Sequence, residues 1–302
     1  MQTFYSHGKL LISAEYAVLD GALALALPTK FGQSLKVEPT HKNTIHWKSI
    51  SNEGVVWFEA EFTIDVDLKV STTDTSTIAQ RLLQVLDALQ QLNPTHFEAH
   101  KGYILTSTLE FPENWGLGSS STLINNLAQW AEVDAFELLE RTFGGSGFDI
   151  ACAQQDSGIL YQLKEGIPSI KPVNFSPPFL EALFFVHRNQ KQNSRDGIAS
   201  YKTHTKNQTL DFSELNGLTL NLLNCTDLNS FESLIEQHER RISMLIQQPP
   251  LKEALFSDYE GAIKSLGAWG GDFFLATGNT DSMDYFISKG YTTVVPFRDM
   301  IL

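Results

Sequence analysis

Apolar residues recur at steps of three and four along two stretches, 77–91 and 228–247, and each pattern predicts an amphipathic helix. The apolar positions of the first stretch are Ile78, Leu82, Leu86 and Leu89, and those of the second include Phe231, Leu234, Ile235, Ile242 and Leu245. Asn93-Pro94 follows the first stretch and Pro249-Pro250 follows the second. Proline lacks the backbone N–H that a helix needs, so both helices are expected to end there.

Strands and further helices follow one another in mixed order. Residues 55–63 alternate like a strand with one exposed face. Apolar runs predict further strands at 2–6, 33–38, 103–109, 158–163, 182–187, 273–276 and 291–297, and helices are expected at 119–131, 135–142, 195–205 and 281–288. Because no regular βαβ rhythm is visible, we expect an α+β fold. The proline-rich stretch 164–180 predicts a domain boundary, with domains at 1–170 and 171–302.

Composition and charge narrow the classes of protein. The 302 residues are 42% hydrophobic and 19% charged, which is ordinary globular usage. The net charge of −13 opposes binding to nucleic acid or to an anionic membrane. Two cysteines are too few for a disulfide framework, and the histidines lack paired metal-ligand spacing. The histidine spacing therefore leads us to expect no transition-metal site. Because no signal peptide is visible, we expect a cytoplasmic protein.

The segment 112–121, Pro-Glu-Asn-Trp-Gly-Leu-Gly-Ser-Ser-Ser, is a glycine-rich loop that enters the predicted helix 119–131. Gly116 and Gly118 allow backbone to approach a ligand closely. The unpaired N–H groups and positive dipole end of a helix start suit a phosphate group. The alternative is an ordinary turn with a serine cap, because such motifs also occur by chance.

Three more segments carry possible chemistry. Residues 8–21 hold Lys9 and Glu15, where a lysine could stabilise phosphoryl charge, or both could be surface residues. Residues 144–151, Gly-Gly-Ser-Gly-Phe-Asp-Ile-Ala, place Asp149 at a loop–helix junction, where it could accept a proton or simply cap the helix. Residues 264–272 form a glycine segment before a strand, which could pass close to phosphates or form a turn.

In their order and spacing, these four segments resemble the GHMP kinase superfamily along nearly the whole chain. GKLLISAEYAVLDG and GSGFDIA are most similar to the mevalonate kinase and phosphomevalonate kinase branch, and the Gly-Phe-Asp-Ile-Ala form is closest to phosphomevalonate kinases and to bacterial relatives with Gly-Tyr-Asp-Ile-Ala. The resemblance implies a two-domain α+β fold. Its N-terminal domain would bind ATP and resemble domain 2 of ribosomal protein S5, and its C-terminal domain would be ferredoxin-like.

The resemblance also implies roles for single residues. Asp149 and Lys9 would be catalytic, Asp149 as the base and Lys9 as the cation that steadies the transferred phosphoryl group. The nucleotide would be bound by Gly116, Leu117, Gly118, Ser119, Ser120, Ser121 and Glu15. Ser120 and Glu140 would hold Mg²⁺. The segment 183–195 is similar to the opening of the second domain in these kinases, and its residues His187, Lys191, Ser194 and Arg195 would bind an acidic substrate or else form a solvated loop.

The implied activity is ATP-dependent phosphoryl transfer to a small mevalonate- or phosphomevalonate-like acid of isoprenoid biosynthesis, by a monomer or homodimer. Two alternatives stay open. One is an ATP-dependent decarboxylase of the diphosphomevalonate type, and the other is a catalytically silent binding protein with the same fold. Trp269 and Asp272 motivate the silent alternative, because the family usually has Gly-Ala-Gly-Gly-Gly at this position.

Overall fold

The computed structural model describes residues 1–98, 100–190, 194–206, 208–269 and 271–302. The chain divides into two compact units. Unit 1 consists of Met1–Gly8, Phe31–Glu113 and Gly118–Gln154, and unit 2 consists of Lys9–Lys30, Asn114–Leu117 and Gln155–Leu302. Strands β1 (Gln2–Leu11) and β2 (Ala24–Thr40) each contribute residues to both units.

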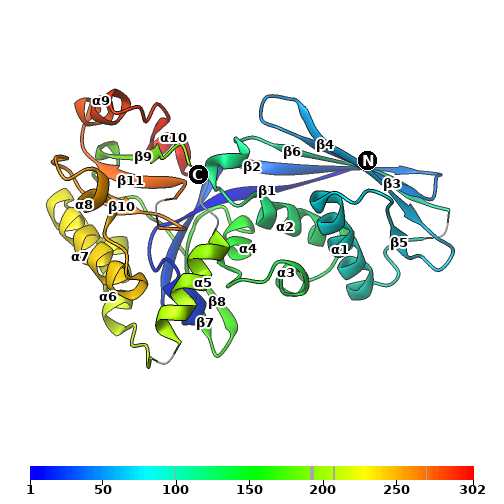
Figure 1. Ribbon diagram of the computed structural model, residues 1–302, viewed down its shortest axis with the longest axis horizontal. Helices are drawn as coiled ribbons and strands as arrows, with labels where there is room; N and C mark the ends of the chain where they lie inside the picture. The colour runs from blue at the N-terminus through cyan, green and yellow to red at the C-terminus, as the bar shows by residue number, and fades with distance from the viewer. Residues whose placement is uncertain (99, 191–193, 207, 270) are drawn as a thin grey trace. The chain divides into compact units, whose positions relative to one another are not determined.

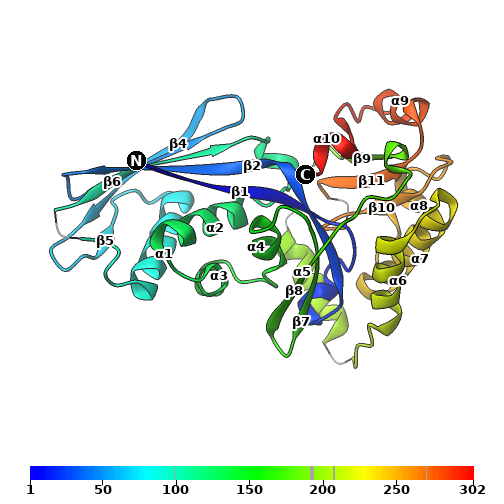
Figure 2. The same cartoon turned by 180° about the vertical axis from the view of Figure 1, so that it is seen from behind.

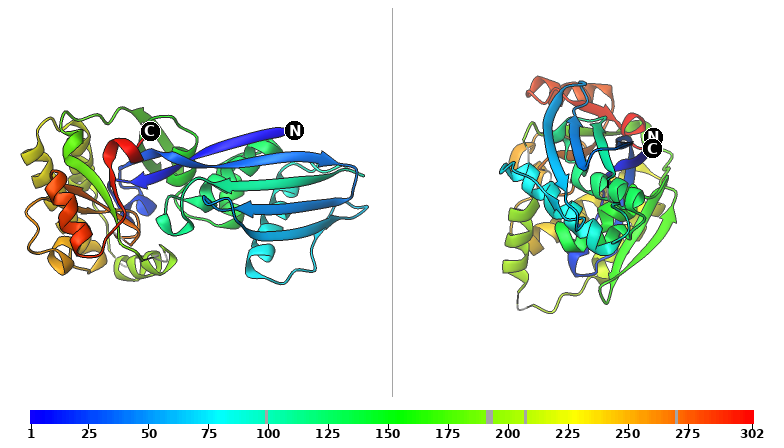
Figure 3. Two further views of the ribbon diagram at one scale, coloured as in Figure 1. Left: turned by 90° about the horizontal axis from the view of Figure 1, so that it is seen from above. Right: turned by 90° about the vertical axis from the view of Figure 1, so that its right-hand side faces the viewer.

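Unit 1 is built on a mixed sheet with the strand order β5-β4-β3-β6-β2 (Figure 3). Its further strands are β3 (Thr44–Ile50), β4 (Val56–Ile64), β5 (Val70–Ser71) and β6 (Gly102–Leu109). Strands β3 and β6 are parallel, and the other neighbours are antiparallel. Side chains alternate between the two faces, so β3 buries every second residue, including Trp47.

Four helices cover one face of this sheet (Figure 1). They are α1 (Thr77–Leu92), α2 (Ser119–Ala131), α3 (Ala135–Thr142) and α4 (Phe148–Ala153). The side chain of Ser76 caps α1 and that of Asp134 caps α3, each by accepting a backbone N–H of the first turn. The apolar faces of all four helices join the sheet in one core, to which α4 contributes Ile150.

Unit 2 contains a second, antiparallel sheet with the strand order β10-β11-β9-β12 (Figure 2). Its strands are β9 (Leu183–His187), β10 (Ile263–Ser265), β11 (Phe273–Thr277) and β12 (Val294–Pro296). The helices of unit 2 are α5 (Ser194–Thr205), α6 (Ser213–Asn224), α7 (Leu228–Ile246), α8 (Leu251–Leu255), α9 (Thr280–Ser288) and α10 (Phe297–Met300). Aromatic residues, among them Phe256, Phe274 and Phe286, dominate the core between α8, α9 and this sheet.

Prolines in the stretch 164–180 do not prevent strand formation. Strand β7 (Gly158–Lys164) turns into β8 (Ile167–Val173), which contains Pro168 and Pro172 and pairs with β7 at the edge of the described sheet. An edge strand tolerates proline because one row of its backbone groups faces away from any partner. The first part of β2 pairs with the other side of β7.

The helices expected at 77–91, 119–131, 135–142 and 228–247 are present with bounds that differ by at most one residue. The elements that were not expected include β3, β5, β8, β10, α6, α8 and α10. Strand β3 contains His46 and Lys48 on its exposed face, and this polar content masked its alternation. None of the helices among the described residues is both long and apolar enough to cross a bilayer.

Candidate nucleotide site

A small cleft in unit 2 brings together residues from three of the four segments singled out in the sequence. Lys9 comes from the end of β1, and Gly116 comes from the loop 112–121, the glycine-serine segment. Gly267 and Asp272 come from the segment 264–272, which precedes β11. The cleft is completed by Leu10, Leu11, Trp115, Leu266 and Phe273. A lysine and two glycines around a small cleft are the groups that a phosphate ligand needs, namely a cation and accessible backbone.

Lys9 is tied to the glycine-serine segment through both its backbone and its side chain. The backbone N–H of Lys9 donates to the carbonyl of Leu117 at 3.0 Å, and its Nζ donates to the carbonyl of Gly116 at 3.3 Å. The ammonium group is thereby held beside the loop that precedes α2. A cation at this place can neutralise charge on a group bound by the loop.

Gly116 is needed for the packing of the cleft as well as for its backbone conformation. Its φ of 65° lies in the left-handed region, which favours glycine. A Cβ built on Gly116 would stand 2.0 Å from Oδ2 of Asp272, so the Asp272 side chain lies directly against the glycine. The cleft therefore contains a carboxylate next to its glycine backbone, which opposes the binding of an anion.

Trp269 adopts a left-handed backbone conformation, which favours glycine, with a φ of 56°. Its buried indole donates from Nε1 to the carbonyl of Pro249 at 3.2 Å. This hydrogen bond and the burial of the ring offset part of the backbone strain, which for a non-glycine residue is about 1–2 kcal/mol.

The start of α2 in unit 1 presents backbone donors. Gly118 is the residue before the helix, with a φ of 88°, and it has no side chain that could cap the first turn. The N–H groups of Ser119, Ser120 and Ser121 belong to that turn and have no acceptor within the helix. Ser120 is exposed. Residues Ser119–Ser121 thus form a helix start whose backbone N–H groups could donate to a phosphate.

Buried polar residues fix α2 to the sheet of unit 1. The Thr122 hydroxyl donates to the side-chain carbonyl of Gln33, and the Asn126 amide donates to the Gln33 main-chain carbonyl at 2.8 Å. Ser6 donates to Asn126 at 2.7 Å and accepts from Asn125 at 2.9 Å. A helix held by satisfied buried hydrogen bonds has little freedom to shift when a ligand binds its end.

Asp149 lies in the first turn of α4, one residue inside the helix. Gly147 occupies the position before the helix with a φ of 82°, so Asp149 is not the residue that caps it. At the other end of α4, the Gln154 amide donates to the Asn125 side chain on α2 at 3.0 Å. The two helices that carry Asp149 and the serine segment are therefore joined by a direct polar contact within unit 1.

The expected metal ligands lie on separate elements of unit 1. Ser120 opens α2, and Glu140 is exposed in the last turn of α3. Within the described ranges, no group of three or more His, Cys, Asp or Glu side chains is arranged to hold a metal ion. The expected binding of Mg²⁺ by Ser120 and Glu140 stays a prediction.

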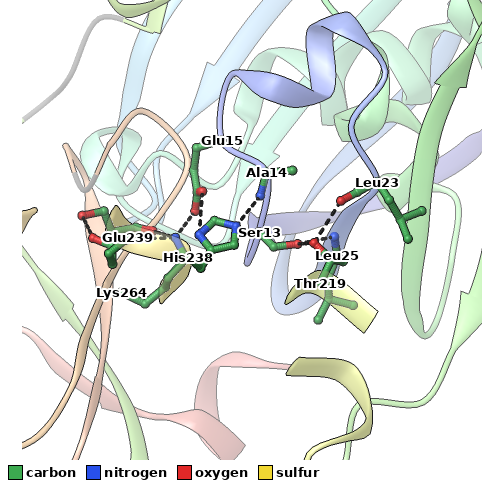
Figure 4. A network of polar contacts seen from close by, with 10 residues as sticks. Ser13, Ala14, Glu15, Leu23, Leu25, Thr219, His238, Glu239 and Lys264 are labelled. Atoms are coloured by element: carbon green, nitrogen blue, oxygen red, sulfur yellow. Dashed lines mark hydrogen bonds and ion pairs between the residues drawn. The ribbon is translucent and has the colours of Figure 1, made fainter. Parts of the chain in front are cut away.

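Glu15 is fully buried and bonded to Lys264, which lies on β10 (Figure 4). Burial raises the pKa of Glu15 to about 7, and the neighbouring Lys264 opposes this rise. Burial would lower the pKa of Lys264, but Glu15 and Glu239 outweigh it and raise that pKa above its ordinary value. The expected contact of Glu15 with a nucleotide stays a prediction.

The four expected substrate residues are placed differently from one another. His187 is buried at the end of β9, and both ring nitrogens meet main-chain groups: Nδ1 accepts from Asn189 N–H at 3.3 Å, and Nε2 lies 2.9 Å from the Asn114 carbonyl. With Nδ1 accepting, Nε2 carries the proton and donates to Asn114, which steadies the loop before Gly116. Ser194 and Arg195 begin α5, their side chains lie outside the described part, and Lys191 lies outside it altogether.

Sequence reasoning missed three contacts around the cleft: Asp272 against Gly116, His187 with Asn114, and Glu15 with Lys264. Only the last left a signal. Lys264 stands among apolar residues in Ala262-Ile263-Lys264-Ser265-Leu266, and a lone charge in such a run indicates a buried ion pair.

No family model matches the chain, and no curated protein sequence does. Solved structures match it along nearly its whole length. They include the mevalonate kinase of Methanococcus jannaschii, at 12% identity and a TM-score of 0.69, covering 97% of this chain and 96% of that one. The phosphomevalonate kinase of Streptococcus pneumoniae, solved with phosphomevalonate and AMPPNP, is 18% identical at a TM-score of 0.67 and covers 96% of each chain.

A third match is the galactokinase of Lactococcus lactis in complex with galactose, at 13% identity and a TM-score of 0.69, covering 94% of this chain and 87% of that one. The predicted α+β class and the GHMP kinase fold are thereby confirmed. These identities are low, and one fold hosts many functions, so the likeness establishes the fold alone.

Proposed function

We propose that the protein is an ATP-dependent kinase that transfers the γ-phosphoryl group to a small acidic metabolite resembling mevalonate or phosphomevalonate. The observation that carries this proposal is the cleft in which Lys9, Gly116 and Gly267 meet, together with the open helix start at Ser119–Ser121 in the same stretch of chain. The fold supports it, because the matched structures include kinases of both acids.

Each group of the chain has a defined task in this proposal. The N–H groups of Ser119–Ser121 and the Ser120 hydroxyl donate to phosphate oxygens, and Ser120 with Glu140 would hold Mg²⁺. Mg·ATP supplies the phosphoryl group and part of the charge neutralisation. Lys9 offsets negative charge on the phosphates, and Asp149 accepts the proton of the attacking group, which is a hydroxyl in mevalonate and a monoprotonated phosphate in phosphomevalonate. Catalysis then consists mainly of positioning and electrostatic stabilisation.

The acceptor would be bound by residues at the start of α5, Ser194 and Arg195, since a helix start and a guanidinium both favour anions. Phosphomevalonate carries a carboxylate and a phosphate, so it needs more positive charge than mevalonate does. We favour it because of the Gly147-Phe148-Asp149-Ile150-Ala151 sequence. The decarboxylase alternative differs only in releasing CO₂ after phosphorylation.

A second candidate function is a catalytically silent binding protein, and the position of Asp272 against Gly116 favours it. Thermal unfolding with Mg·ATP decides between the two, because a ligand of the folded state raises Tm by mass action. The kinase proposal predicts a clear increase in Tm at millimolar Mg·ATP. A Tm that ignores Mg·ATP would refute nucleotide binding and with it the kinase.

A further inference from the structure

A buried ionic cluster lies in unit 2, close along the chain to residues that line the cleft, and the proposed function gives it no task. Its members are Glu15 after β1, His238 and Glu239 on α7, and Lys264 on β10 (Figure 4). Their side chains are between 0% and 4% exposed. Burying charge is unfavourable unless partners compensate, so each charged member of the cluster needs partners within it.

Lys264 is the centre of the cluster. Its Nζ donates to Oε1 of Glu15, to Oε1 of Glu239 at 3.0 Å and to the carbonyl of Ser265. The second oxygen of Glu239 accepts from the Ser265 hydroxyl at 2.7 Å. All three ammonium hydrogens therefore have acceptors, and Glu239 holds two successive residues of β10 at once.

The neutral form of His238 holds the backbone of Ala14. Its Nε2 accepts from the N–H of Ala14 at 3.0 Å, so Nε2 must keep its lone pair and the proton sits on Nδ1. That Nδ1 lies 3.9 Å from Oε2 of Glu15. Burial, with a smaller contribution from Lys264, lowers the pKa of His238 well below its ordinary value, which agrees with this tautomer.

The segment that the cluster holds is strained. Ala14 has a φ of 64° and Tyr16 a φ of 60°, and non-glycine residues adopt this region only at a cost of about 1–2 kcal/mol each. Such conformations persist where the surroundings over-determine them. Here Ala14 is held by His238, Glu15 by Lys264, and the Ser13 hydroxyl by Thr219 at 2.9 Å.

The two segments joined by the cluster are the ones that supply two walls of the cleft. Lys9, Leu10 and Leu11 line the cleft and lead directly into Ser13–Glu15. Lys264 and Ser265 lead directly into Leu266 and Gly267, which also line the cleft. The ion pair between Glu15 and Lys264 thus joins the two segments that continue from these lining residues.

We propose that Lys264 and Glu239 are positioning residues that hold the Leu266–Gly267 wall against the Lys9 strand in the arrangement that binds nucleotide. This inference rests on the proposed function for its kinetic consequence, while its structural consequence can be measured without nucleotide. In this proposal neither Lys264 nor Glu239 contacts the nucleotide. Each acts through the backbone of β10, which it holds in place.

The test compares Glu239→Leu with Glu239→Gln and with a matched control, Glu236→Leu. Glutamine keeps the shape and can bond both Lys264 and Ser265, whereas leucine can bond neither. Glu236 lies one turn earlier on α7, and its side chain is 46% exposed and pairs with Arg240 at 3.5 Å. Leucine there changes the same charge on the same helix without reaching β10.

We expect Glu239→Leu to speed amide hydrogen exchange at Leu266–Ala268 and to raise KM for ATP about tenfold, with kcat within about threefold. Glu239→Gln should keep the exchange rate at Leu266–Ala268 and the KM for ATP close to those of the parent protein. Glu236→Leu should change neither the exchange rate nor KM. Partial unfolding would lower the active fraction and therefore the apparent kcat, but it would leave KM unchanged, so KM separates positioning from stability.

A lower Tm with unchanged exchange at Leu266–Ala268 and unchanged KM would overturn the inference and leave the cluster a stabilising element only. If the parent protein fails to bind ATP, the proposed function is refuted separately. The exchange measurement on the unliganded variants then decides alone whether Glu239 fixes the Leu266–Gly267 wall.

Discussion

Replacing Asp272 by asparagine tests whether a carboxylate beside the glycine segment weakens nucleotide binding. The Asp272 carboxylate lies against Gly116, and both residues line the cleft together with Lys9. Asparagine has the same shape, so the substitution removes a charge and leaves the packing on Gly116 nearly unchanged. We expect the variant to bind Mg·ATP more tightly than the parent protein.

The magnitude follows from Coulomb's law. A phosphate charge held by the backbone beside Gly116 would lie about 6 Å from the Asp272 carboxylate, which at an effective dielectric constant of about 20 corresponds to about 3 kcal/mol of repulsion. Asp272 is only partly buried, and water and Lys9 screen it, which reduces the net effect to about 1 kcal/mol. The dissociation constant should therefore fall about fivefold.

Calorimetric titration with Mg·ATP measures this change. The matched control is Glu165→Gln, which removes one exposed carboxylate from the turn between β7 and β8. The gain in affinity of Asp272→Asn should shrink at 1 M salt, because screening weakens the repulsion that was removed. Equal or weaker binding by Asp272→Asn would show that Asp272 does not face the bound phosphates, and the placement of nucleotide beside Gly116 would be wrong.

Three further predictions concern single residues. Ser120→Ala should raise the dissociation constant for Mg·ATP about tenfold in the same titration, with the unliganded Tm unchanged, because the exposed hydroxyl is one charge-assisted hydrogen bond to phosphate; an unchanged constant would contradict the phosphate role. Asp149→Asn should lower kcat at least about 100-fold with ATP affinity unchanged, and turnover within a few-fold of the parent would leave Asp149 without a catalytic role. Glu15 should make the protein less stable as pH rises from about 4.5 to 7, because its raised pKa means that the folded chain binds the proton more tightly than the unfolded chain does. Denaturant unfolding should show this loss, up to about 3 kcal/mol, in the parent but not in Glu15→Gln, and parallel pH profiles would refute it.

The sequence predicted the fold class and the main helices because periodic apolar positions report burial directly. The spacing of residues 77–91 defined α1 to within one residue. The sequence did not predict β8, because the prolines of 164–180 suggested a domain boundary. Only the pairing with β7 shows that residues 167–173 form an edge strand.

The glycine segments of the site could be found from the sequence, but their tertiary partners could not. Glycine at 116 and 118 indicated close backbone approach, and both positions have positive φ. Nothing local indicates that Asp272 fills the space above Gly116 or that Glu15 meets Lys264, because these contacts join residues more than 150 positions apart in the chain.

Release of ADP that depends on an added acceptor tests the central claim most directly. The protein is incubated with Mg·ATP and, in separate reactions, with mevalonate, phosphomevalonate, galactose or homoserine. The proposed function predicts ADP release with an acid of the mevalonate type, greatest with phosphomevalonate, and no release of CO₂. Release with galactose or homoserine alone would make the acceptor class wrong, CO₂ would indicate the decarboxylase, and no ADP above the ATP-only background with any acceptor would contradict the kinase.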